Sequence, residues 1–186
     1  MANKEKSPQS SEDVRQSRVE DEYFQIRLEK IEKLKEAGLA AYPDRFENAL
    51  SCGQAAQKEE GAENIRCAGR ITSMRKMGKL MFAHIQDVTG KVQVALRRDG
   101  VGKEEFKVAK SVLDTGDFIG VEGTMFVTRT GEITIDVQQY IFLSKSLRSL
   151  PEKWHGLTDV EIRYRQRYLD LSSIRTPRLR APTYRR

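Results

Sequence analysis

The sequence predicts a mainly-β fold with helices, in which a small five-stranded barrel follows an amino-terminal α-helix. Three observations lead to this prediction. Apolar residues recur at helical spacing before Gly38, and from Ile65 onward they alternate with polar residues. Short turn sequences then divide residues 65–143 into strands and one further helix. The chain of 186 residues is long enough for one such domain with an extension at each end.

The amino-terminal segment 1–12 is polar and is expected to be disordered. Segment 13–64 is expected to hold a helix and its connection to the barrel. Gly38 is a natural helix stop, and Pro43 prevents a restart. Four apolar residues make one stripe along this helix, as expected for a face that packs on a core: Phe24, Leu28, Ile31 and Leu34.

The barrel domain is expected over residues 65–147. Its first strand shows the two-residue period of a half-buried strand, and Gly120 and Gly123 offer a place for a bulge in the fourth. Three strands, a helix and two strands in this order are typical of an OB-fold, whose second and third strands present a face that binds oligonucleotides. The expected elements are strands 65–71, 80–86 and 92–96, helix 103–113, and strands 118–128 and 132–143.

The formal net charge is +6, but the charge is unevenly placed. The tail 172–186 holds five arginines and no acid, and without them the net charge of the rest is only +1. The overall charge is therefore a poor sign of a binding face. A better sign is segment Arg66–Lys110, with eleven Lys or Arg against four Asp or Glu, because a surface that neutralises phosphates needs such a local excess.

Several site classes are not expected from the sequence. The two cysteines, Cys52 and Cys67, form no C-x-x-C pair, so no metal site is predicted and both are read as reduced thiols of a cytoplasmic protein. No apolar run approaches the roughly 20 residues of a membrane span, and the amino terminus lacks a secretory signal. No phosphate loop or nucleophile elbow is present, so no catalytic residue is predicted.

A large aromatic residue, Phe82, is expected on the polar face of the second strand. Residues two positions apart share a face, so Phe82 lies with His84 and Gln86, opposite an apolar set. Unpaired bases stack on such rings, with a gain of about 1–3 kcal/mol each. Phe82 could instead close the end of the barrel. His84 has no evident partner in the sequence and is expected to be an ordinary surface residue.

Three polar residues complete a candidate site for one unpaired base. Gln93 can donate and accept hydrogen bonds, whereas Glu132 only accepts and could therefore read an imino N–H group. Arg75 can bind a carbonyl oxygen or a phosphate. Gln93 and Glu132 would also suit ordinary solvated strand positions. The predicted nucleic-acid site consists of Arg75, Phe82, Gln93 and Glu132.

The run Pro151–Leu171 contains Trp-His-Gly-Leu and Arg-Tyr-Arg-Gln-Arg-Tyr. It resembles the linker that joins the anticodon-binding domain to the catalytic domain in class II (IIb) lysyl-tRNA synthetases. Shorter patterns that align with the same family include Met77-Gly78-Lys79 and Thr130-Gly131-Glu132. The resemblance covers about residues 24–171 and ends abruptly before the tail.

The resemblance implies that Arg75, Phe82, Gln93 and Glu132 hold the central anticodon base, which is uridine for lysine. The expected partner is thus tRNA with a lysine anticodon. Segment 148–171 is then expected to be a linker toward an absent catalytic domain. Segment 172–186 is expected to be a disordered tail that does not match the family, as in a truncated or frameshifted chain. The parent enzyme is a homodimer that uses ATP and Mg²⁺, whereas this fragment is expected to be inactive alone and could be monomeric.

Two alternatives remain open at this point. The chain could be a free-standing OB module that binds single-stranded nucleic acid without anticodon preference. It could also be a fragment of an aspartyl- or asparaginyl-type synthetase, which shares the barrel and the central uridine. The Trp-His-Gly-Leu and Arg-Tyr-Arg-Gln-Arg-Tyr runs favour the lysine family over the aspartyl or asparaginyl type.

Overall fold

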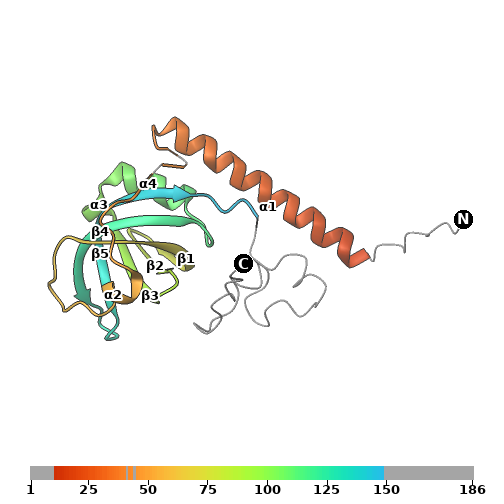
Figure 1. Ribbon diagram of the computed structural model, residues 1–186. Helices are drawn as coiled ribbons and strands as arrows, with labels where there is room; N and C mark the ends of the chain where they lie inside the picture. The colour runs from red at the N-terminus through yellow and green to blue at the C-terminus, as the bar shows by residue number, and fades with distance from the viewer. Residues whose placement is uncertain (1–10, 41, 44, 149–186) are drawn as a thin grey trace, which may run out of the picture.

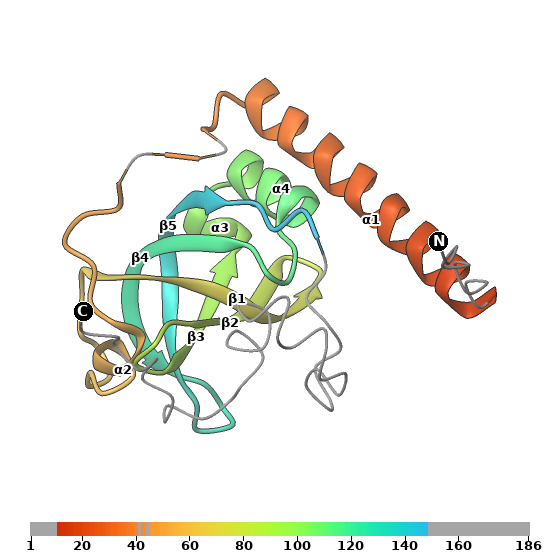
Figure 2. The ribbon, with the colours of Figure 1, turned by 45° about the vertical axis from the view of Figure 1, so that its right-hand side comes forward.

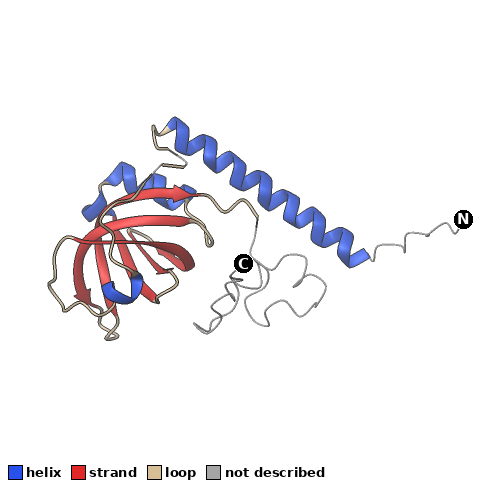
Figure 3. Ribbon diagram, in the orientation of Figure 1, coloured by secondary structure: helices blue, strands red, loops and turns tan. Residues whose placement is uncertain are grey.

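A computed structural model describes residues 11–40, 42–43 and 45–148, which form a long helix beside a β-barrel (Figure 1). Figure 3 shows the strands as one curved wall, with the helices outside it. The predicted linker and tail lie outside the described residues, apart from Arg148. In chain order the elements are α1 (Ser11–Glu36), α2 (Cys52–Ala55), β1 (Ile65–Met77), β2 (Leu80–Gln86), β3 (Lys91–Arg97), α3 (Arg98–Val101), α4 (Lys103–Val112), β4 (Phe118–Val127) and β5 (Ile133–Ser144).

The strands close a five-stranded barrel in the order β1-β2-β3-β5-β4, as the predicted OB-fold requires. The pair β3–β5 is parallel, and the four other pairs are antiparallel. Helix α4 connects β3 to β4 and covers one end of the barrel through Phe106, Ala109 and Val112. The predicted fold class is confirmed.

Three differences from the predicted elements exceed a shift of one residue. Strand β1 continues to Met77, because a register shift between Ile71 and Ser73 breaks the alternation without ending the strand. The short helices α2 and α3 were not predicted, since four residues are too few to show a helical period. Helix α1 begins at Ser11, within the segment expected to be disordered.

The predicted bulge in the fourth strand is present. The β4–β5 register shifts between Glu122 and Gly123. A Cβ atom on Gly123 would collide with the carbonyl oxygen of Asp136, so the close approach of the two strands depends on glycine at this position.

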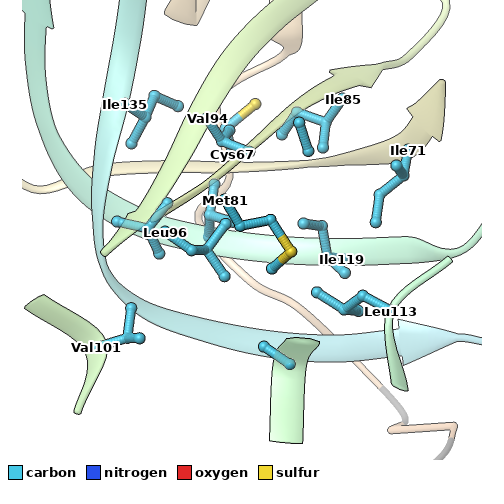
Figure 4. Close-up of a cluster of buried hydrophobic side chains, with 14 of the residues drawn as sticks. Cys67, Ile71, Met81, Ile85, Val94, Leu96, Val101, Leu113, Ile119 and Ile135 are labelled. Atoms are coloured by element: carbon cyan, nitrogen blue, oxygen red, sulfur yellow. The ribbon is translucent and has the colours of Figure 1, made fainter. Parts of the chain in front are cut away.

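The core fills the inside of the barrel with the apolar residues of each alternating strand. Met81 and Ile85 of β2, Val94 and Leu96 of β3, and Ile135 of β5 are all inaccessible to solvent. Figure 4 shows these side chains converging between the strands. The opposite set of each strand therefore faces outward, and it includes three residues of the predicted nucleic-acid site: Arg75, Phe82 and Gln93.

Helix α1 lies outside α4 and contacts it (Figure 2). Only part of the predicted apolar stripe is buried, because Ile31 and Leu34 are covered whereas Leu28 is 39% exposed. The helix ends as predicted: Gly38 adopts a φ of 71°, and the next N–H group, that of Leu39, donates to the carbonyl oxygen of Leu34.

A buried group of charges joins β5 to the end of α4. The side chain of Lys145 is fully buried, and its Nζ donates to Asp114 Oδ2 at 2.6 Å, Asp117 Oδ2 at 2.7 Å and the carbonyl oxygen of Val112 at 2.6 Å. Lys30 of α1 binds the same Asp114 carboxylate at 2.7 Å. Sequence patterns do not reveal this cluster, because its members lie far apart in the chain.

The short helix α2 is fixed at the opposite end of the barrel. Ser51 and Gln54 form a capping box, and the N–H group of Cys52 donates to Asp87 Oδ2 at 2.8 Å. Cys52 and Cys67 are free thiols, both fully buried, with their sulfur atoms 3.6 Å apart. Their contact, together with burial, raises the pKa of the Cys52 thiol well above its usual range.

We expect both thiols to be inert in the folded protein, since the thiolate is the reactive form and neither sulfur reaches solvent. An aromatic disulfide reagent at mildly alkaline pH should release almost no coloured product until the protein is unfolded in guanidinium chloride. It should then report both cysteines. Rapid reaction of one thiol in the native protein would instead show that α2 detaches readily from the barrel.

Candidate nucleic-acid interface

The strand register places the predicted site residues in adjacent cross-strand rows on the outer face. Arg75 lies opposite Phe82 in the β1–β2 pair, and His84 lies opposite Gln93 in the β2–β3 pair. Phe82 and His84 are two residues apart on β2, so both point outward. The sequence predicts Glu132 as the first residue of the fifth strand. In the structure β5 begins at Ile133, so Glu132 is the last residue before the strand.

Gln93 and Glu132 are in direct contact. The Gln93 side-chain amide donates from Nε2 to Glu132 Oε2 at 2.6 Å. Its Oε1 accepts a hydrogen bond of 2.7 Å from the hydroxyl of Thr134, which is fully buried. These two contacts fix which end of the amide is oxygen and which is nitrogen, because Glu132 can only accept. One N–H group and one lone pair of the amide remain for a ligand.

His84 belongs to the same group of side chains, and the expectation that it lacks a partner is wrong. Its Nε2 lies 2.8 Å from Glu132 Oε1, and its Nδ1 lies 2.9 Å from the Ser73 hydroxyl. We call His84, Gln93, Glu132 and Thr134 the polar cluster. Sequence reasoning missed His84 and Thr134, because Glu132 approaches His84 from 48 residues further along the chain.

A hollow of about 330 Å³ opens at the polar cluster. Lys91 also lines it and lies on the outward side of β3, two residues before Gln93. Phe82 and Arg75 are not among the lining residues, so they flank the hollow from the next row. The remaining lining is small or apolar: Ala56, Val92, Gly131 and Ile133.

Phe82 is half-buried and is not among the residues packed against the barrel core. Its partner on β3 is Ala95, a small residue that is fully buried although it belongs to the outward set. Within the described residues, arginines stack over Phe46, Phe118 and Phe126 but not over Phe82. A ring that lies outside the core without a guanidinium over it suits stacking by a base.

Basic residues surround the polar cluster on this face. Arg75 is exposed on β1, and Lys91 is exposed at the start of β3. Arg97, at the end of β3, pairs with Asp136 through an Nε–Oδ1 distance of 3.2 Å and lies over the ring of Phe126. Because phosphate groups accompany every base of a nucleic acid, this arrangement supports binding of a polyanion.

Other site classes find no support within the described part of the chain. Among the residues that the structure describes (11–40, 42–43 and 45–148), no set of three or more metal-ligating side chains comes together. Over the same described residues, no helix is long and apolar enough to cross a membrane.

Comparison with known proteins adds independent information. Residues 65–143 match the tRNA anti-codon family, described as an OB-fold nucleic acid binding domain. The lysine–tRNA ligase of Pelotomaculum thermopropionicum is 47% identical over 175 residues, which are 92% of this chain and 34% of that protein. The lysine–tRNA ligase of Aquifex aeolicus is 48% identical over 143 residues, or 68% of this chain and 24% of the relative.

The lysine–tRNA ligase of Thermotoga maritima is 44% identical over 158 residues, which are 81% of this chain and 32% of the relative. The chain thus spans about a third or less of the length of these relatives. The matches fall on their amino-terminal region.

Proposed function

Because its barrel belongs to the tRNA anti-codon family of OB-fold domains, we propose that this chain binds the anticodon loop of a lysine tRNA. The observation that carries the proposal is the contact between Gln93 and Glu132 beside Phe82, on the outer face of β2 and β3. An aromatic ring, an oriented amide and a carboxylate are the groups that a protein needs to recognise a single unstacked base.

The hydrogen-bonding pattern favours uracil at this position. A uracil edge carries an imino N–H at N3 next to a carbonyl oxygen, whereas cytosine has a lone pair at N3. The free N–H group and lone pair of the Gln93 amide can pair with the edge of either base. Glu132 accepts only from a donor, so it can bind the imino N–H of uracil but not N3 of cytosine. A cytosine would place its N3 lone pair near acceptor oxygens, which costs binding free energy.

In this proposal the barrel serves recognition, as the amino-terminal part of a lysine–tRNA ligase. The parent reaction, ATP-dependent attachment of lysine to tRNA, is proposed for a catalytic domain that needs ATP and Mg²⁺. A cytoplasmic location, where tRNA is charged, is part of the same proposal.

The test is a comparison of anticodon stem-loops that differ only in the central base. We expect the lysine stem-loop to bind more tightly than its central-cytosine variant by about 1–3 kcal/mol, which is about 5- to 150-fold in affinity. Fluorescence anisotropy with labelled stem-loops at fixed salt measures both affinities.

A stem-loop with one swapped base pair in the stem is the control and should bind like the parent. Equal affinity for both central bases would instead indicate a general single-strand binder. The anticodon stem-loop of an aspartate tRNA also has a central uridine, so it tests the alternative that the chain is a fragment of an aspartyl- or asparaginyl-type synthetase. A lysine-specific chain should bind this stem-loop more weakly than the lysine stem-loop.

A further inference from the structure

We propose that His84 is a positioning residue for base recognition, and that it acts by holding the carboxylate of Glu132 in place. The proposal rests on the proposed function, since it concerns the same site. His84 lies between Ser73 of β1 and Gln93 of β3 in one cross-strand row, and its side chain is 26% exposed.

The two contacts of the imidazole ring define its role. The Glu132 carboxylate can only accept a hydrogen bond, so the ring donates from Nε2 across the 2.8 Å contact. In the neutral ring Nδ1 then accepts from the Ser73 hydroxyl at 2.9 Å. Glu132 therefore sets the tautomer of the neutral ring, and Ser73 helps to hold the ring in the orientation that this contact needs.

Glu132 needs such support because of its place in the fold. It lies in the turn between β4 and β5, and its side chain is 44% exposed. The two carboxylate oxygens are held by different donors: Oε1 by His84 and Oε2 by Gln93. Two anchors fix the plane of the carboxylate, whereas one anchor leaves it free to rotate.

The consequence for binding is preorganisation. A carboxylate offers about four lone-pair directions, so two remain for a base after His84 and Gln93 have bound. If the anchor to Oε1 is lost, binding must pay for ordering the side chain again. The loss should appear as weaker discrimination between central bases, because stacking on Phe82 does not depend on His84.

Two substitutions of His84 separate the two ring nitrogens. In His84→Gln the side-chain amide nitrogen can take the place of Nε2 and still donate to Glu132. In His84→Asn the shorter side chain can replace Nδ1 but does not reach Glu132. We expect His84→Asn to reduce the uridine-over-cytosine affinity ratio about tenfold, and His84→Gln to keep it within about threefold of the parent.

A double-mutant cycle tests whether His84 acts through Glu132. In a Glu132→Ala background the ratio should already be low, and adding His84→Asn should not lower it further. Thermal melting of each variant measures any effect on folding. An unchanged ratio in His84→Asn, or an equal further loss in the Glu132→Ala background, would overturn the role of His84.

The parent chain and His84→Asn together distinguish a failure of the proposed function from a failure of the role of His84. If the parent chain itself shows no preference for central uridine, the proposed function fails, and the role of His84 fails with it. If the parent discriminates and His84→Asn discriminates equally well, only the role of His84 is lost. A fall in binding of both stem-loops by the same factor would likewise assign His84 a structural role alone.

Discussion

Replacing Lys145 with methionine should lower the free energy of unfolding by about 3–5 kcal/mol. The Lys145 side chain and the Asp117 carboxylate are both fully buried and 2.7 Å apart. Without the lysine, Asp117 keeps only the backbone N–H groups of Asp114 and Ser146 as donors within the described residues. A buried carboxylate without a cation is costly, whereas the methionine fills much of the same volume.

Urea denaturation followed by circular dichroism measures this change. Lys35→Met is the matched control, because Lys35 is 61% exposed and, within the described residues, pairs only with Glu32 on the same helix. The control should change the free energy of unfolding by less than about 0.5 kcal/mol. A Lys145→Met protein as stable as the control would contradict the inference that this buried cluster holds α4 and β5 together.

The pH dependence provides a second check. Burial raises the pKa of Asp114, but hydrogen bonds and charge from Lys145 and Lys30 outweigh it and hold the pKa below its ordinary value of 3.8. Because the pKa of Asp114 is lower in the folded than in the unfolded state, its ionised carboxylate stabilises the folded protein at pH values above the ordinary pKa. This stabilisation is lost as the pH falls through the lowered pKa. The difference in free energy of unfolding between the parent and Lys145→Met should therefore become smaller below about pH 4.

Phe82→Ala should weaken binding of the lysine anticodon stem-loop by about 1–3 kcal/mol. The ring lies outside the core of the barrel, beside the polar cluster, so we expect the loss of stacking without loss of the fold. Anisotropy titration measures the affinity, and circular dichroism shows whether the barrel persists. Both central-base variants should be weakened alike, because a ring stacks on uracil and cytosine with little preference.

Tyr23→Ala is the control for this prediction. Tyr23 is a 52% exposed aromatic residue on α1, away from β2 and β3, and its loss should leave binding unchanged. If Phe82→Ala unfolds the protein while binding per folded molecule stays the same, Phe82 closes the end of the barrel and does not stack on a base.

The faces of the strands could be read from the sequence alone. Alternation is a local property with a period of two residues, so it identified Phe82 and Gln93 as outward residues and Met81 and Val94 as core. The order of strands and the single helix then predicted the barrel, because few topologies fit that order. The strongest family motif, Pro151–Leu171, lies outside the described residues and stays a sequence prediction.

Only the tertiary structure decided which of these residues touch. The parallel pairing of β3 with β5 brings Thr134 beside Gln93, and the turn before β5 carries Glu132 to His84. A sequence pattern cannot give these contacts, because they depend on register and barrel closure across 39 or more residues. The buried Lys145 cluster could not be predicted either, because its contacts also depend on the fold. A charged residue is recognised as buried only when the fold supplies its partners.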